Sequence, residues 1–348
     1  MQIAAVGSAF PPHYYDQETL LDAFRGAWNA QHHNPRRLER LHRAVLVGGR
    51  HLALPMERYE QIETFGQAND AWIEVAQDLG EAAMLDGLER AGLVPEDVDA
   101  LFFVSVTGLA TPSIDARLVN RLGLRSDVKR NPLFGLGCVA GAAGLSRASD
   151  YLRAFPDQVA VLLSVELCSL TLQLRDLSIP NLISSGLFGD GAACAVLTGR
   201  ERQATGPRIL ATRSIFYPDT ERVMGWDIGE TGFKIVLSAE VPEVAKRFLP
   251  RDVDAFLASH GLTRADITTW ICHPGGPKVL DAMQTGLDLP EGALDRTWRS
   301  LREVGNLSSS SVLMVLQDQL TEPPASGAWG LVLAMGPGFC SELVLIRW

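Results

Sequence analysis

The stretch NPLFGLGCVAGAAGLSRASDYLRAF, residues 131–155, is the part of the chain around which we expect the fold to be organised. It starts with apolar residues and then has two glycines, Gly135 and Gly137, which are typical of a tight turn. Cys138 follows, and after it come small residues and apolar residues at helical spacing. This pattern predicts Cys138 at a strand-to-helix turn, where the helix dipole and free N–H groups favour an anion and lower a thiol pKa. Such a thiol is a nucleophile, and the glycines before it leave room for a substrate. The alternative is a small, buried, apolar cysteine.

Length and composition indicate a protein with a large folded core. The chain has 348 residues, of which 47% are apolar and 21% charged, so apolar burial can offset the entropy of ordering the chain. No apolar run reaches the roughly 18 residues that span a membrane, and the N-terminus predicts a strand rather than a signal peptide. The net charge of −10 argues against nucleic acid or an anionic membrane as a partner.

The five cysteines do not indicate a disulfide framework or a metal site. They are scattered, odd in number and form no Cys-x-x-Cys pair: Cys138, Cys168, Cys194, Cys272 and Cys340. We interpret them as the cysteines of a protein in a reducing, cytoplasmic compartment, and we expect no metal.

Apolar strands that alternate with helical patterns predict an α/β fold. We expect strands at 2–9, 99–106, 133–136, 159–165, 192–197, 208–216, 269–272, 329–335 and 342–346. Helices are expected at 17–31, 35–45, 69–91, 112–122, after Cys138, and at 241–260, 277–286 and 308–320, with a loop at 173–185.

The second expected helix carries a basic face in an otherwise acidic chain. Arg36, Arg40 and Arg43 recur at helical spacing, with Arg37 and Arg50 nearby. This cluster could hold phosphates such as those of coenzyme A. A solvated helix face explains the pattern equally well.

The pattern restarts after residue 200, which indicates an internal repeat. GLVPEDVDALFFVS, from Gly92, aligns without gaps with GLTRADITTWICHP, from Gly261. At nearly the same offset, Cys138 before a helix aligns with Asn306 before a helix, and GAACAVL near Gly191 resembles GAWGLVL near Gly327. We predict two similar α/β halves, 1–200 and 201–348, related by a pseudo-twofold axis. Equivalent turns would meet near that axis, and ligands gather where strands end and helices begin.

Two residues of the second half complete a candidate catalytic set with Cys138. His273 ends the apolar strand TWICH, and Asn306 precedes a serine run and a helix. Alone, such a histidine is more often structural, and such an asparagine is more often a helix cap. Together with Cys138, the imidazole can pair with the thiolate, and His273 and Asn306 can donate hydrogen bonds to an enolate or a tetrahedral oxyanion.

These motifs together resemble the type III polyketide synthases, the chalcone synthase-like enzymes of the thiolase superfamily. The resemblance covers nearly the whole chain and rests on GLGCVAG, LFGDGAA at 187–193, HPGGP at 273–277, GNLSSSS at 305–311 and the MGPGF loop at 335–339. It implies a thiolase-type fold, a homodimer, acyl-CoA and malonyl-CoA as substrates, and no further cofactor. It also implies that Cys138 carries the acyl group while His273 and Asn306 drive decarboxylation of malonyl-CoA.

The resemblance further implies a set of pocket residues. Phe188 falls on a gatekeeper phenylalanine, Ile235 stands where plant enzymes have a second one, and Thr111 replaces a methionine that reaches into the partner's cavity. Cys168 and Thr171 fall on the cavity wall, and smaller side chains there leave more room. Further substrate contacts are expected from Ser308, Gly336 and Pro337, and coenzyme A contacts from Arg43, Arg50, Gly275 and Lys278.

The TPSIDARL and TGFKIVLS segments resemble bacterial members, several of which take long fatty acyl starters. We therefore expect repeated decarboxylative condensation onto a medium or long acyl chain on Cys138, closing to an alkylpyrone or alkylresorcinol. The alternatives are a β-ketoacyl-ACP synthase III-like enzyme, which the HPGG and MGPG loops argue against, and a catalytically silent binding protein of the same fold.

Overall fold

The computed structural model describes residues 1–28 and 35–348, so part of the helix expected at 17–31 lies outside the described residues. The main element is one mixed sheet of nine strands within the described part. From edge to edge it contains β11 (Ile267–Cys272), β12 (Trp329–Gly336), β13 (Cys340–Arg347), β8 (Arg208–Phe216), β1 (Gln2–Ala9), β7 (Asp190–Thr198), β6 (Val159–Leu167), β4 (Ala100–Ser105) and β5 (Lys129–Phe134).

The strand order of the first half recurs in the second. β1 is antiparallel to β7, β7 is antiparallel to β6, and β6 is parallel to β4. β8, β13, β12 and β11 follow the same order with the same relative directions. The two halves join in one sheet because β1 meets β8 at Gln2 and Arg208.

One of the three aligned segment pairs occupies an equivalent place in this repeat, and a second does so only approximately. The 3-10 turns Pro95–Asp97 and Arg264–Asp266 lead into β4 and β11, as the alignment from Gly92 and Gly261 predicts. Cys138 lies within the 3-10 turn before α5 (Ala140–Ala154), whereas Asn306 lies two residues before the 3-10 turn Ser308–Ser310 that leads into α10 (Ser311–Thr321). The third pairing is wrong, because it matches β7 with β12. By strand order β7 corresponds to β13, and β12 corresponds to β6.

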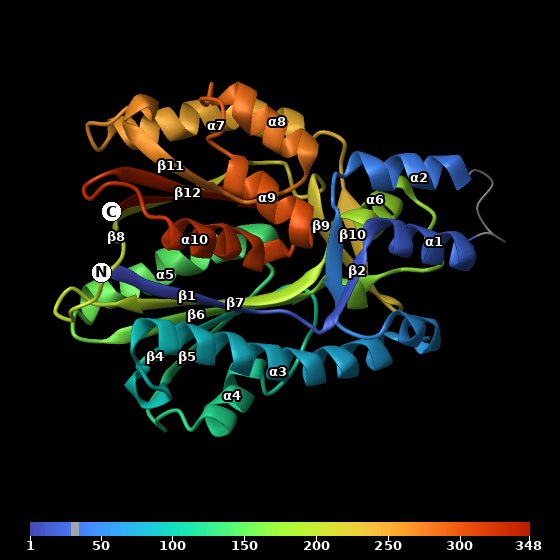
Figure 1. The fold of residues 1–348 in the computed structure, drawn as a ribbon, viewed down its shortest axis with the longest axis horizontal. Coiled ribbons are helices and arrows are strands. Elements are labelled where there is room, and N and C mark those ends of the chain that lie inside the picture. Colours follow the sequence, from blue (N-terminus) through green and yellow to red (C-terminus); the bar gives the residue numbers. More distant parts are fainter. Residues whose placement is uncertain (29–34) are drawn as a thin grey trace.

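Helices cover the sheet on its outer faces and fill the space between its two halves (Figure 1). α3 (Phe65–Ala91) and α4 (Ile114–Leu122) cover the first half, and α7 (Val241–Ala258) and α8 (Pro277–Gly286) cover the second. The central helices α5 (Ala140–Ala154) and α10 (Ser311–Thr321) pack against each other. The small residues after Cys138 permit this approach, since a Cβ at Gly141 would lie 2.3 Å from the Ser309 carbonyl oxygen.

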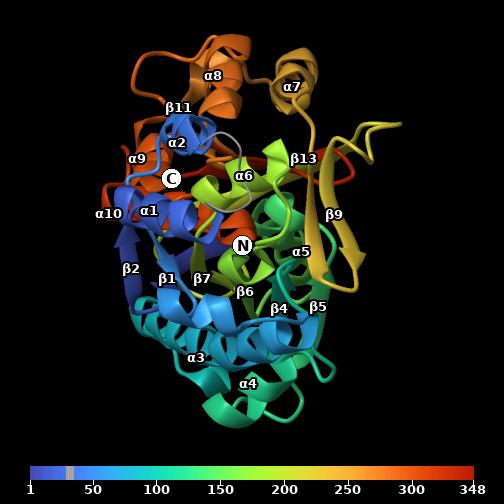
Figure 2. The same ribbon diagram turned by 90° about the vertical axis from the view of Figure 1, so that its right-hand side faces the viewer.

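Shorter elements surround the edge of the sheet where the candidate site lies (Figure 2). They are α1 (Gln17–Trp28), α2 (Pro35–Ala44), α6 (Ile179–Leu187), α9 (Asp295–Val304), the ribbon of β2 (His13–Asp16) and β3 (Gly49–Leu52), and the hairpin of β9 (Met224–Gly229) and β10 (Gly232–Leu237). No helix among the described residues is long and apolar enough to cross a membrane.

Most predicted elements are confirmed, and the errors fall around the site. The loop expected at 173–185 is wrong, because α6 begins there with the Ser178 hydroxyl accepting from the Asn181 N–H at 3.4 Å. β5 begins at Lys129 rather than at residue 133. The pattern did not predict α9 or the β9–β10 hairpin.

Candidate active site

Cys138 lies at the predicted strand-to-helix turn. A 3-10 turn, Gly137–Val139, leads directly into α5. Gly137 has φ +54°, and a Cβ there would lie 2.7 Å from the Pro337 ring, so only glycine fits between Cys138 and the MGPGF loop. The thiol is 6% exposed and donates to the Ser308 hydroxyl at 3.7 Å.

The expected low thiol pKa does not follow from this environment. Burial raises the pKa of the Cys138 thiol to about 12, with a smaller opposing effect of the Ser308 hydroxyl. Burial likewise lowers the pKa of His273 to about 3. Both groups are therefore neutral at pH 7. For Cys138, the effect of the apolar surroundings on the thiol pKa exceeds the opposite effect expected from the helix N-terminus. A thiolate here depends on proton transfer to a nearby base.

His273 follows β11 and is held by its backbone. Its N–H donates to the Leu333 carbonyl at 2.9 Å, and its side chain is 3% exposed. Neither ring nitrogen has a hydrogen-bond partner among the described residues. Because buried polar atoms are normally paired, this imidazole is available to accept a proton from, or donate one to, a bound substrate.

Asn306 is fixed by its backbone and by its side-chain oxygen. Its N–H donates to Leu187 O at 2.9 Å, and its carbonyl accepts from the Gly189 N–H at 3.0 Å. Asn306 Oδ1 accepts from the Ser308 N–H at 2.8 Å. The oxygen is therefore used in the fold, and the Nδ2 amide is the group left to donate to a ligand.

The three predicted catalytic residues line the same cavity. Cys138, His273 and Asn306 share a space of about 30 Å³ with Phe188, and Gly275 forms part of its wall. A thiol, an imidazole and a carboxamide donor thus line one small and mostly apolar cavity, where hydrogen-bond donors stabilise developing negative charge more effectively than in water.

Two further cavities continue past Phe188. The middle one, about 30 Å³, is lined by Cys138, Cys168, Ile235, Ser308 and Pro337. The outer one, about 110 Å³, shares Cys168, Phe188 and Ile235 with it and adds Thr171. Phe188 lines all three cavities, as expected of a residue that separates neighbouring parts of a binding site. Gly336 lines none of the three, but a Cβ there would lie 2.7 Å from the Val139 N–H nitrogen, beside the nucleophile turn.

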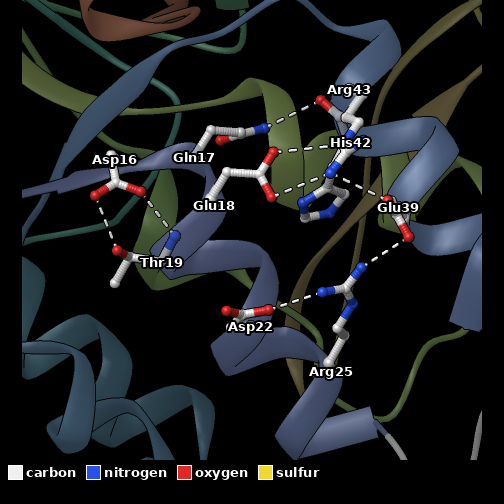
Figure 3. A network of polar contacts seen from close by, with 9 residues as sticks. All are labelled: Asp16, Gln17, Glu18, Thr19, Asp22, Arg25, Glu39, His42 and Arg43. Carbon is white, nitrogen blue, oxygen red and sulfur yellow. Dashed lines mark hydrogen bonds and ion pairs between the residues drawn. The ribbon is translucent and has the colours of Figure 1, made fainter.

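Three of the other residues predicted to bind substrate or coenzyme A lie outside these cavities. Thr111 is exposed and lines none of them in a single chain. Lys278 is exposed in the first turn of α8. Figure 3 shows Arg43 with Glu18 and Glu39, whose carboxylates lie 3.4 Å and 3.1 Å from its guanidinium and offset its charge.

Arg50 does not belong to an exposed basic cluster, and this expectation is wrong. The residue lies in β3, is 1% exposed, and lines the outer cavity. Its position follows from pairing of β3 with β2, which carries the chain inward away from α2.

A buried acid that acts on Cys138, Glu166, was not predicted from the sequence. Glu166 in β6 is fully buried and accepts hydrogen bonds from Val106 N–H at 3.1 Å, from Thr107 Oγ1 at 2.9 Å and from the Ser309 hydroxyl. Burial raises its pKa, and its charge in turn contributes to raising the pKa of Cys138. A glutamate inside the strand VAVLLSVEL, in which Ser164 is the one other polar residue, was the available signal.

Comparison with known proteins agrees with this geometry. Residues 1–201 match the model for chalcone and stilbene synthases, N-terminal domain, and residues 208–348 match that for the C-terminal domain. The chain is 54% identical to a 1,3,6,8-tetrahydroxynaphthalene synthase of Streptomyces peucetius subsp. caesius, covering 99% of this chain and 93% of the relative. It is 32% identical to a phloroglucinol synthase of Pseudomonas fluorescens, with 97% of each chain covered.

A solved structure gives the same answer for the fold. The 1,3,6,8-tetrahydroxynaphthalene synthase of Streptomyces coelicolor, a bacterial type III polyketide synthase, superimposes with a TM-score of 0.94 at 32% identity over 100% of this chain and 99% of the other. The nine-stranded sheet with paired central helices is therefore the thiolase-type fold of those enzymes. The chain belongs to the chalcone and stilbene synthase family and is a type III polyketide synthase.

Proposed function

We propose that this enzyme condenses malonyl-CoA units into an aromatic polyketide of the tetrahydroxynaphthalene type. The observation that carries the proposal is the shared cavity of Cys138, His273 and Asn306 in a chain 54% identical to a synthase of that name. Type III polyketide synthases are malonyl-CoA-dependent condensing acyltransferases that use CoA-linked substrates and need no additional cofactor.

The first step loads Cys138. His273, neutral and unpartnered, accepts the thiol proton as the sulfur attacks the thioester carbonyl of the starter. The tetrahedral intermediate collapses with cleavage of the carbon–sulfur bond to coenzyme A. The departing thiolate takes the proton from His273, and the acyl group remains on Cys138.

The second step extends the chain. The bond between the carboxylate and the methylene of malonyl-CoA breaks, CO₂ leaves, and its electron pair forms an enolate. The imidazole N–H of His273 and Nδ2 of Asn306 donate to the enolate oxygen. The enolate carbon attacks the acyl-cysteine, a carbon–carbon bond forms and the Cys138 thiolate departs. The lengthened chain returns to Cys138 for another round.

The name of the relative constrains the starter by its chemistry. A tetrahydroxynaphthalene skeleton has about ten ring carbons with oxygens at alternating positions, the pattern of about five two-carbon units joined head to tail. Malonyl-CoA can supply every unit, so no alkyl starter is needed. This supports malonyl-CoA as both starter and extender.

A second candidate is a fatty acyl starter with an alkylpyrone or alkylresorcinol as product. The outer cavity favours it, since Leu20, Phe24, Met56 and Ile235 are among its lining residues. Each buried methylene would contribute about 0.8 kcal/mol, partly offset by ordering of the chain.

The deciding experiment is mass spectrometry of products from malonyl-CoA alone and with acyl-CoAs of rising length, for wild type and Ile235→Phe. The proposal predicts an aromatic product from malonyl-CoA alone. Products only when a fatty acyl-CoA is added would support the second candidate, and in that case Ile235→Phe shortens the preferred chain. An absence of polyketide under all these conditions would refute both.

We also propose a homodimer that works in the cytoplasm. Thr111, exposed beside α4, is where the family resemblance brings one subunit to the other's cavity, and all five cysteines are free thiols, as in a reducing compartment. Light scattering at micromolar concentration tests the dimer, and a monomer would contradict it.

A further inference from the structure

Arg50 places a positive charge in the wall of the outer cavity, which adjoins the middle cavity lined by Cys138. The outer cavity, lined by Arg50, shares Cys168, Phe188 and Ile235 with the middle cavity, which reaches Cys138. Most other lining side chains of the outer cavity are apolar. A buried cation in such a place carries a large desolvation cost, which an anionic ligand would offset.

The hydrogen bonds of Arg50 leave donors unused. Its guanidinium has five N–H groups. Nη1 donates to Gln17 Oε1 at 2.7 Å and to Gly186 O at 2.5 Å, and Nη2 donates to Ser185 O. No other acceptor for Arg50 is present among the described residues, so Nε and one N–H of Nη2 remain available. The buried hydroxyl of Ser184, in the same cavity wall, also has no partner there.

The charge of Arg50 is not neutralised by a direct ion pair within the described part of the chain. Asp190 is the nearby carboxylate that favours its charged form, but Asp190 accepts from Ala53 N–H at 2.6 Å and Ser169 N–H at 2.8 Å instead. Burial lowers the pKa of Arg50 only to about 10, so the group stays cationic at pH 7.

We propose that Arg50 determines acyl specificity by binding a terminal carboxylate of the chain carried on Cys138. The ligand class is the acyl group of a dicarboxylic acid linked to coenzyme A through one end, of which malonyl is the smallest. The inference rests on the proposed condensing function. It favours a carboxylate-ended starter over a fatty one, because an alkyl terminus cannot accept from the free donors and leaves the buried cation uncompensated.

Arg50 also has a structural role, and the test must distinguish this role from ligand binding. Its bonds to Ser185 O and Gly186 O cap the C-terminal end of α6. Gln17 shares that role, since its Nε2 donates to Gly186 O at 2.9 Å and to His42 O at 3.2 Å (Figure 3 shows the latter contact). Gln17→Leu therefore weakens the same support without removing the charge, and it is the matched control.

The experiment is competitive loading of Cys138, followed by intact-protein mass spectrometry without extender. Length-matched pairs are offered in equal amounts: succinyl- with butanoyl-CoA, glutaryl- with pentanoyl-CoA, and adipyl- with hexanoyl-CoA. Wild type is expected to load the carboxylate-ended group in about tenfold excess for at least one length. Arg50→Met should abolish that excess, Arg50→Lys should keep part of it, and Gln17→Leu should keep it.

Two results would overturn the proposal: preference of wild type for the alkyl group at every length, or an unchanged preference in Arg50→Met. If Arg50→Met does not fold, the wild-type pairs decide the matter. The role of Arg50 and the proposed function can fail separately. If the enzyme makes polyketide from malonyl-CoA but shows no preference for carboxylate-ended acyl groups, only the role of Arg50 is refuted.

Discussion

The backbone of Asn306 is paired with that of Phe188 in an isolated parallel bridge. The two hydrogen bonds, Asn306 N–H to Leu187 O at 2.9 Å and Gly189 N–H to Asn306 O at 3.0 Å, join the GNLSSSS loop to the residue that lines all three cavities. The loop bends at Gly305, which has φ +76° and where a Cβ would lie 2.7 Å from Leu187 O. Asn306 and Phe188 are thus held as one unit.

Substitution of Asn306 should separate decarboxylation from loading. Asn306→Asp keeps the Oδ1 acceptor for Ser308 N–H and removes the Nδ2 donor, whereas Asn306→Ala removes both. We expect both variants to lose CO₂ release from malonyl-CoA by about 2.7–4 kcal/mol, or 10²–10³-fold, while acyl loading on Cys138 falls much less. Equal loss in the two steps would contradict the role as an enolate donor.

Removal of the nucleophile should stop condensation but not all decarboxylation. Cys138→Ala leaves His273 and Asn306 in the same cavity, so we expect no polyketide and residual CO₂ release. Cys194→Ala is the control, because that cysteine is fully buried and lines none of the three cavities. Substantial polyketide from Cys138→Ala would remove the residue from its proposed role.

Thiol reactivity should depend on His273. In its buried environment the Cys138 thiol has a pKa raised to about 12, which leaves roughly one thiolate in 10⁵ at pH 7. Proton transfer to His273 forms an ion pair and provides thiolate at lower pH. The pH profile of iodoacetamide alkylation should therefore rise at lower pH in wild type than in His273→Gln, whose rate should still be increasing above pH 9. Superimposable profiles would show that His273 does not activate the thiol.

Asp190 should make stability fall as the pH rises. Burial raises the pKa of this carboxyl from 3.8 to about 6. Because the folded state binds the proton more tightly, stability is lost between about pH 4 and pH 6 and stays lower above that range. Relative to Asp190→Asn, wild type should lose about 2 kcal/mol in free energy of unfolding from pH 4 to pH 7, measured by urea denaturation at each pH. A constant difference between the two proteins would contradict this assignment.

Elements with strong local patterns were predictable from the sequence. The strands β1 and β8 and the helix α8 have the predicted bounds, since regularly spaced apolar residues and flanking turn residues mark them. The turn that carries Cys138 also follows from the glycines, and the repeat places Asn306 just before the corresponding turn of the second half.

What the sequence could not predict depends on contacts distant in the chain. The helix α6 is short and apolar, and the β9–β10 hairpin is stabilised by packing such as Phe65 against Phe233. Arg50 lies near a basic helix in sequence but is drawn inside by strand pairing. The thiol pKa follows from how completely the site is buried, which a helix N-terminus alone does not reveal.

Rapid mixing of the enzyme with malonyl-CoA, followed by quenching and mass spectrometry of the intact protein and its Cys138 peptide, tests whether Cys138 carries the growing chain. We expect a ladder of adducts on Cys138 that differ by one two-carbon ketide unit and disappear in Cys138→Ala. Polyketide formation with no adduct on Cys138 at any quench time would contradict it.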